Sequence, residues 1–289
     1  FKMTEKLKGN RLSWYDPKID LIRVGPKGYV MPRSYIDQAE NIYNLPIRPS
    51  DVYVFCPSIV LPSYYKVESI EKKEKIFKIL EVNTQPVTEK LAAMPSPRFI
   101  KTHLPMSFLP PTIVDTAKVI YIARDARDIA VSCYHHARLL KILDFTGEFK
   151  DFWELFMTDL IRTPHFEHVK EAWNMRDHPN MLFLFYEELA KDLPAVVRRV
   201  ANFLGKEVTE NQMTRLCDHL SFENFKKNKS VNYEDLREID VVSPKENFIR
   251  KGKVNGWRDY FDEDMTEQAE RWIEDNLRDT DLRFPHMTS

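Results

Sequence analysis

Glycine is scarce in this sequence. The 289 residues contain seven glycines, whereas an average usage near ~7% would supply about twenty. They are Gly9, Gly25, Gly28, Gly147, Gly205, Gly252 and Gly256. Because residues 29–146 contain none, a glycine-rich phosphate-binding loop of the usual kind is excluded from that stretch.

Cysteine and long apolar runs are equally limited. The three cysteines, Cys56, Cys133 and Cys217, share no metal-ligand spacing and are too few to cross-link a chain of this length. The amino-terminal letters FKMTEKLKGN lack the apolar core of a signal peptide, and runs such as residues 119–123 are too short to span a bilayer. These absences predict a cytoplasmic protein with no bound metal and no membrane-spanning segment.

The charges nearly balance, with 43 lysines and arginines against 44 acidic residues and a formal net charge of -1. This balance argues against a general nucleic-acid binder and against a protein that adheres to anionic membranes, so any anion site must be local. With 43% apolar and 30% charged residues, the chain can bury a sizeable core. No linker, repeat or low-complexity tract is visible, and we expect a single domain over residues 1–289.

Four short runs rich in β-branched and aromatic residues are each followed by a helical pattern. The runs are residues 51–56 (DVYVFC), 98–102 (RFIKT), 118–123 (KVIYIA) and 181–185 (MLFLF). Each run is nearly continuously apolar, which predicts strands buried on both faces of a parallel sheet. We therefore expect an α/β fold, a parallel sheet flanked by helices.

Three helices carry clear start, stop or packing signals. Acidic residues favour a helix start at residues 125–140, and Pro194 and Gly205 bound a helix over residues 192–204. A third helix is predicted over residues 263–279. One stripe of this helix carries the residues Met265, Ala269, Trp272, Ile273 and Leu277. We interpret this stripe as core, because such stripes are mostly buried.

Side chains that can carry chemistry follow three of the predicted strands. Lys101 and His103 end the second run, Arg124 and Ser132 follow the third, and Tyr186 follows the fourth. Ligands of open α/β sheets bind at the carboxyl ends of the strands. We therefore expect these side chains to converge on one edge of the sheet.

Two of these residues have both a functional and a plain structural interpretation. His103 is a candidate general base, because an imidazole can take a proton from a hydroxyl near neutral pH. The alternative is a packed, hydrogen-bonded histidine, which is the more frequent case and applies equally to His135 and His136. Arg124 suits a phosphate, since its guanidinium and the helix N-terminus would act on the same anion. Its alternative is a surface ion pair.

A second basic cluster lies far downstream at Arg250, Lys251, Gly252 and Lys253, shortly before Gly256. Glycine beside cations lets backbone amides approach an anion closely while the side chains supply charge. Most basic runs are solvated loops. Two of the seven glycines stand in this short segment, however, and we therefore treat it as a candidate anion site.

Four ordered motifs resemble those of the cytosolic sulfotransferases. They are KTHLP from Lys101, RDARDIAVSCYHH from Arg124, FYEELAKDLP from Phe185 and FIRKGKVNGW from Phe248. The resemblance implies transfer of a sulfuryl group from 3'-phosphoadenosine 5'-phosphosulfate (PAPS) to a hydroxyl of a small lipophilic acceptor, such as a phenol, a sterol or another alcohol, without a metal. It also implies a three-layer architecture similar to that of P-loop transferases.

The resemblance assigns a role to each candidate by its position in these motifs. His103 matches the catalytic base, and Lys101 matches a cation that flanks the transferred group. Arg124 and Ser132 match residues that hold the 3'-phosphate, and Tyr186 matches a tyrosine near the adenine. The remaining matches are Phe222, an aromatic residue that stacks on the adenine, and a second clamp on the 3'-phosphate, formed by Arg250, Lys251 and Gly252.

One signature of the family is missing after the first predicted strand. The family carries there a loop resembling YPKSGTTW, which holds the 5'-phosphosulfate, whereas this chain continues from Cys56 with PSIVLP. We infer that this loop and the helix after it are excised. Loss of three charge-assisted hydrogen bonds, at about 1.5–3 kcal/mol each, would weaken cofactor binding by roughly 4 kcal/mol or more.

Two alternative functions follow from this gap. The first is a catalytically impaired sulfotransferase-like protein that retains 3'-phosphonucleotide binding or acts as a scaffold. The second is a nucleotide kinase of similar architecture. The missing lysine-containing loop argues against this alternative as strongly as it argues against an active sulfotransferase.

The sequence says less about the acceptor and about the oligomeric state. Apolar side chains in residues 104–109 and 135–152 suggest an apolar pocket for the acceptor. The dimer motif of the family is not found cleanly after Trp257. The sequence therefore predicts no oligomeric state.

Overall fold

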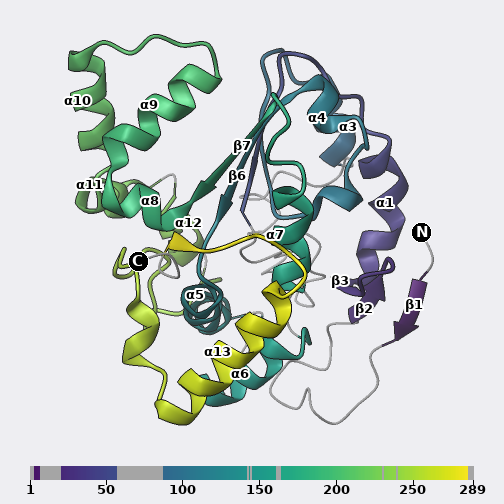
Figure 1. Cartoon of the computed structure of the whole chain (residues 1–289), viewed down its shortest axis with the longest axis vertical. Coiled ribbons are helices and arrows are strands. Elements are labelled where there is room, and N and C mark those ends of the chain that lie inside the picture. The colour runs from purple at the N-terminus through teal and green to yellow at the C-terminus, as the bar shows by residue number, and fades with distance from the viewer. Residues whose placement is uncertain are drawn as a thin grey trace.

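The computed structural model describes residues 3–6, 21–56, 87–141, 143, 145–160, 164–229, 231–238 and 240–285. Its main sheet is parallel, with the strand order β5-β4-β6-β7. Figure 1 labels β6 and β7 of this sheet. The strands are β4 (Val52–Phe55), β5 (Phe99–Thr102), β6 (Lys118–Ala123) and β7 (Met181–Phe185). The four predicted runs are therefore confirmed as strands of one parallel sheet.

The strand β5 differs from the prediction that every strand is buried on both faces. It lies at the edge of the sheet. Phe99 is 67% exposed and Lys101 is also exposed, while Ile100 between them is buried. This alternation is typical of a strand with one covered face. The prediction was wrong here because an apolar run does not distinguish an edge strand from a central one.

The three predicted helices form close to their expected bounds, as α5 (Ala126–Leu139), α9 (Leu193–Phe203) and α13 (Glu263–Leu277). Asp125 and Asp192 accept backbone N–H groups at the starts of α5 and α9, at 2.8 and 3.0 Å, so both helices begin with an acidic cap. The stripe on α13 is confirmed as core. Its most buried members are Met265, Ala269, Ile273 and Leu277, which are at most 5% exposed.

Helices cover both faces of the parallel sheet. Tyr121 of β6 packs in a buried cluster that includes Val169 of α7 (His165–Trp173). The neighbouring Ile120 belongs to a different cluster, which includes Val196 of α9. Because successive residues of a strand point to opposite faces, the sheet lies between two helical layers. The three-layer α/β architecture is thereby confirmed.

The remaining elements surround this sheet. A small antiparallel sheet, which the sequence did not predict, contains β1 (Met3–Lys6), β2 (Leu21–Val24) and β3 (Tyr29–Pro32). It lies beside α1 (Ile36–Tyr43) in Figure 1. The other helices are η2 (Arg33–Tyr35), α3 (Val87–Ala93), η3 (Met106–Phe108), α4 (Ile113–Thr116), α6 (Phe149–Met157), α8 (Tyr186–Lys191), α10 (Glu210–His219), α11 (Phe222–Lys227), α12 (Glu234–Glu238) and η4 (Gly256–Asp259). None of the described helices is both long enough and apolar enough to cross a membrane.

A buried ion pair fixes the amino ends of β4 and β5. Nε of Arg98 donates to Oδ1 of Asp51 at 2.8 Å, and Nη2 donates to Oδ2 of the same carboxylate. Neither side chain has exposed surface. Arg98 also donates to the carbonyl oxygens of Leu91 and Pro46, each at 2.8 Å. These bonds satisfy the buried guanidinium and hold the two strands in register where they begin.

Candidate functional site

The carboxyl ends of the parallel strands lie at the same edge of the sheet. Phe55 of β4 pairs with Thr102 of β5, and Ala123 of β6 pairs with Phe185 of β7. At this edge β6 leads into α5 and β7 leads into α8 (Figure 1). The residues that directly follow the strands are Cys56, His103, Arg124 and Tyr186. The structure thus brings three of the predicted site residues to one edge.

His103 is held at this edge by the backbone of the neighbouring strand. Its Nδ1 lies 2.9 Å from the carbonyl oxygen of Cys56 and 3.3 Å from Sγ of the same residue. A carbonyl oxygen can only accept a hydrogen bond, so Nδ1 carries the hydrogen. The lone pair of the neutral ring is then on Nε2, which is the nitrogen left to accept a proton.

A second histidine supports the backbone of His103. His168 on α7 donates from Nε2 to the carbonyl oxygen of His103 at 3.1 Å, and its Nδ1 accepts from the hydroxyl of Tyr121 at 2.8 Å. His168 and Tyr121 are fully buried, and burial lowers the pKa of His168. The ring is therefore neutral. His168 was not predicted as a site residue, because a histidine inside a helix gives no signal of this contact.

Arg124 connects the ends of two strands to the downstream basic cluster. Its guanidinium lies over the ring of Tyr186, 4.3 Å from the ring centre. Nη2 donates to the carbonyl oxygen of Lys253 at 3.0 Å and lies 3.4 Å from Oδ2 of Asp128. Nε is buried and has no hydrogen-bond partner among the described residues. A buried guanidinium nitrogen without an acceptor is unusual in a folded protein.

Asp128 anchors the segment that carries the downstream cluster. Its Oδ2 accepts the N–H of Asn255 at 2.9 Å, and its Oδ1 accepts the N–H of Trp257 at 3.0 Å. Burial raises the pKa of Asp128, against the effect of Arg124 and of these two donors. Asp128 was not predicted as a site residue. In the sequence it is one of several acidic residues at the start of α5, where charge alone accounts for them.

Gly252 and Phe222 are in direct contact. Gly252 has a φ of +60°, in the left-handed region. A Cβ atom added to it would lie 2.3 Å from Cδ2 of Phe222. Both the backbone conformation and the close ring therefore require glycine at this position. Two predicted site residues from different parts of the chain meet here.

The remaining predicted site residues differ in their surroundings. Lys101 is exposed on β5, and Ser132 is partly buried on α5. Arg250 donates from Nη1 to the hydroxyl of Tyr260 at 3.3 Å. Lys251 lies 2.8 Å from Asp259 in an exposed ion pair, which adds little stability in water.

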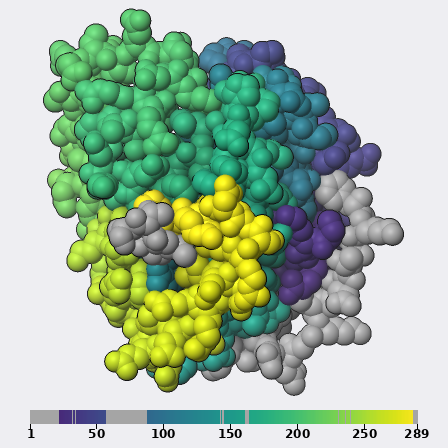
Figure 2. Space-filling model, in the orientation of Figure 1, coloured from purple at the N-terminus to yellow at the C-terminus, as the bar shows by residue number. Residues whose placement is uncertain are grey.

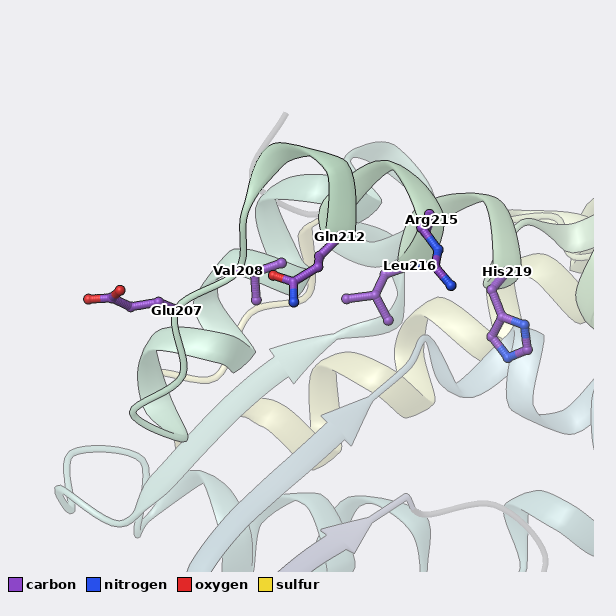
Figure 3. A pocket seen from close by; sticks show the side chains of 6 residues that line it. All are labelled: Glu207, Val208, Gln212, Arg215, Leu216 and His219. Atoms are coloured by element: carbon purple, nitrogen blue, oxygen red, sulfur yellow. The ribbon is translucent and has the colours of Figure 1, made fainter.

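A hollow on the surface lies elsewhere, over α10. Its volume is about 470 Å³, and it is lined by Glu207, Val208, Gln212, Arg215, Leu216 and His219. Figure 3 shows most of these side chains along α10, with Glu207 pointing away from the others. Figure 2 shows this region in green at one corner of the molecule, apart from the yellow carboxy-terminal segment. None of the predicted site residues lines this hollow.

The apolar side chains predicted to form an acceptor pocket pack mainly in the core. Met106, Phe108 and Leu109 are 2–4% exposed, and Phe152 has no exposed surface. Their position shows that they contribute to the two main core clusters. The prediction that the family loop and its helix are excised after Cys56 falls on residues 57–86, which lie outside the described residues. Within the described residues, no group of three or more metal-ligating side chains is found.

Comparison with known proteins identifies relatives along most of the chain. A family model described as "Sulfotransferase domain" matches residues 28–281. Sulfotransferase 1E1 of Bos taurus is 31% identical over 277 residues, which cover 89% of this chain and 93% of the relative. Sulfotransferase 1B1 of Mus musculus is 36% identical over 198 residues, which cover 68% of this chain and 66% of the relative.

Solved structures give the same result. A crystal structure of retinol dehydratase in a complex with retinol and PAP is 44% identical, with a TM-score of 0.88, and the match covers 97% of this chain and 98% of that one. Mouse sulfotransferase SULT7A1 complexed with PAP is 27% identical with a TM-score of 0.69, covering 90% and 95%. With a family model that matches most of its length and relatives that share both sequence and fold, the chain belongs to the sulfotransferase family.

Proposed function

We propose that this chain transfers a sulfuryl group from PAPS to the hydroxyl of a small lipophilic acceptor. The observation that carries this proposal is the hydrogen bond from Arg124 to the carbonyl of Lys253, which joins two basic segments 129 residues apart at the carboxyl edge of the sheet. An anion at this edge would meet cations from both segments and the amino end of α5.

The residues at this edge fit the 3'-phosphate of PAPS. The unpartnered Nε of Arg124 is a donor without an acceptor among the described residues, and Gly252 leaves its backbone accessible where a side chain would collide with Phe222. We propose that the nucleotide is bound by two groups of residues. Those for the 3'-phosphate are Arg124, Ser132, Arg250, Lys251 and Gly252, and those for the adenine are Tyr186 and Phe222.

The proposed chemistry uses His103 and Lys101. PAPS supplies an activated sulfuryl group when it is bound. His103 accepts the proton of the acceptor hydroxyl at Nε2, as the acceptor oxygen forms a bond to sulfur and the bond from sulfur to the 5'-phosphate oxygen breaks, releasing 3'-phosphoadenosine 5'-phosphate (PAP). Lys101 offsets the negative charge that develops on the leaving oxygen. As in phosphoryl transfer, catalysis depends mainly on positioning and charge stabilisation.

The acceptor class is supported by the molecules bound to relatives. Retinol dehydratase, at 44% identity, was crystallised with androsterone and inactive cofactor PAP, and also with retinol and PAP. Androsterone and retinol are lipophilic molecules that carry a hydroxyl. We therefore propose an alcohol of this kind as the acceptor.

A protein that binds PAP without turnover is the second candidate. It is favoured by the sequence after Cys56, which lacks the lysine, glycine and threonines of the family loop. Without these groups the 5'-phosphosulfate would lose several charge-assisted hydrogen bonds.

Binding and turnover measurements separate the two candidates. We expect isothermal titration to show saturable binding of PAP, and an assay with radiolabelled PAPS to give a sulfated product from retinol, androsterone or a simple phenol. Absence of binding at millimolar PAP would contradict both candidates. Binding of PAP with no product from any acceptor would favour the second one.

Substitution of Asp128 tests the link between α5 and the downstream cluster. The Asn255 and Trp257 N–H groups bond to different oxygens of Asp128. In Asp128→Asn, an NH2 group that only donates replaces one of these oxygens, so one of the two N–H groups loses its acceptor. We expect the affinity for PAP to fall about tenfold, measured by isothermal titration. Asp275→Asn, which changes an exposed acid on α13, should bind PAP like the wild type. Unchanged affinity in Asp128→Asn would show that this anchor does not serve the nucleotide site.

We also propose that the chain is a single domain over residues 1–289, located in the cytoplasm. The family model spans residues 28–281 without division, which supports one domain. No disulfide joins Cys56, Cys133 and Cys217, and a reducing compartment is compatible with this. The balanced charge supports a small-molecule substrate rather than a nucleic acid.

A further inference from the structure

Four polar side chains form a continuous hydrogen-bonded chain beside the downstream basic cluster. We call this set, Glu246, His135, Tyr260 and Arg250, the Tyr260 relay. Nδ1 of His135 lies 2.9 Å from Oε2 of Glu246, and Nε2 lies 2.7 Å from the hydroxyl of Tyr260. The same hydroxyl lies 3.3 Å from Nη1 of Arg250. The relay therefore connects α5, which carries His135, to the segment that carries Arg250.

The hydrogens of the relay can be placed in one consistent direction. A carboxylate only accepts, so Nδ1 of His135 donates to Glu246, and Nε2 of the neutral ring accepts from Tyr260. Burial lowers the pKa of His135, although the charge of Glu246 acts in the opposite direction. A guanidinium only donates, so Arg250 donates to the oxygen of Tyr260. Every member thus has a partner of the right polarity.

Packing holds the two rings of the relay in place. The rings of His135 and Tyr260 meet edge to face with their centres 5.5 Å apart, and Tyr260 makes the same kind of contact with Phe149 at 5.3 Å. The side chains of His135 and Glu246 are 15% and 13% exposed. Nε of Arg138 lies 3.3 Å from Oε1 of Glu246 and adds a charged partner at the end of the relay. The Tyr260 hydroxyl is therefore a fixed acceptor for a long, flexible side chain.

We propose that His135 and Tyr260 are positioning residues, which orient the guanidinium of Arg250 toward the 3'-phosphate of the nucleotide. This inference rests on the proposed function, in which Arg250 belongs to the 3'-phosphate clamp. His135 follows Ser132 by three residues, so both side chains lie on neighbouring positions of one helix surface. Without the relay, the Arg250 side chain would be less restrained before the nucleotide binds. It would then lose more rotamer freedom on binding, and the affinity for the nucleotide would be lower.

Comparison of two nucleotides tests the positioning role. Tyr260→Phe removes the hydroxyl but keeps the ring against Phe149. We expect its affinity for PAP to fall by about fivefold to tenfold, with no change for adenosine 5'-phosphate, which lacks the 3'-phosphate. His135→Phe should behave in the same way. A purely structural role would weaken binding of both nucleotides, and equal losses measured by isothermal titration would overturn the proposal.

The same substitution in a protein that lacks the Arg250 side chain gives a second test. In an Arg250→Ala protein, Tyr260→Phe should cause no further loss of PAP affinity, because the relay acts through Arg250; additive losses would overturn the proposal. Tyr233→Phe is the matched control, since it removes a hydroxyl from a nearby ring that stacks on Phe248 with centres 4.2 Å apart. It should bind PAP like the wild type. If the wild type does not prefer PAP to adenosine 5'-phosphate, the 3'-phosphate clamp itself is wrong, and the positioning role with it.

Discussion

Replacing His103 with asparagine is expected to slow sulfuryl transfer by about 10²- to 10⁴-fold. The asparagine amide can take the place of Nδ1 and donate to the Cys56 carbonyl, a bond that His103 makes at 2.9 Å. It has no atom in the place of Nε2, where the acceptor proton would go. The substitution therefore removes the base and preserves the bond that positions it. The measurement is kcat with PAPS and a lipophilic alcohol, both at saturation.

Three further measurements make this prediction specific. His103→Ala removes both the base and the hydrogen bond, and we expect a loss at least as large. Both variants should bind PAP with unchanged affinity, because His103 is assigned to the acceptor rather than to the nucleotide. His219→Ala, an exposed histidine on α10 beside the hollow in Figure 3, should keep the wild-type rate. An unchanged kcat in both His103 variants would refute the base assignment.

The parallel sheet could be predicted because its signal is local. Each of the strands β4 to β7 coincides with an apolar run that can be read from consecutive residues. Strand order is a different property, since it depends on which runs pair. The exposed Phe99 illustrates this, because only the position of β5 at the sheet edge explains an apolar side chain that is 67% exposed.

The site could be predicted in part for the same reason. Residues that directly follow strands, such as His103 and Arg124, are placed by the rule that strand ends meet. Asp128 and His135 could not be found in this way. Their partners Asn255 and Tyr260 are more than a hundred residues away in the chain, and nothing in the local sequence distinguishes them from an ordinary acid and an ordinary packed histidine.

The sequence after Cys56, which lacks the lysine, glycine and threonines of the family loop, is the feature that most affects the expected rate. The alignment with sulfotransferase 1E1 of Bos taurus extends over 277 residues but covers only 89% of this 289-residue chain, so the relative has positions without a counterpart here. The proposed 3'-phosphate clamp, by contrast, draws cations from two segments of the chain, at Arg124 and at Arg250 and Lys251. Nucleotide affinity should therefore depend strongly on the 3'-phosphate, which makes PAP the informative ligand for each variant.

Replacing Gly252 with alanine is expected to lower the affinity for PAP by ~10- to 100-fold. The new Cβ would lie 2.3 Å from Cδ2 and 2.7 Å from Cε2 of Phe222, so the ring must move. Phe222 is proposed to stack on the adenine, and stacking of a base on an aromatic ring contributes about 1–3 kcal/mol. Displacement of the ring therefore reduces nucleotide binding directly, and isothermal titration with PAP measures the loss.

Gly205→Ala is the matched control for this clash. The φ of Gly205 is +64°, close to the +60° of Gly252, and among the described residues no atom lies within 4 Å of an added Cβ. Both substitutions place alanine in the left-handed region, at a cost of about 1–2 kcal/mol, so both should lower the thermal midpoint of unfolding. Only Gly252→Ala should weaken PAP binding. Equal PAP affinity in the two variants would mean that Phe222 does not contact the adenine. Glycine would then be needed at position 252 only for the backbone conformation of its own turn.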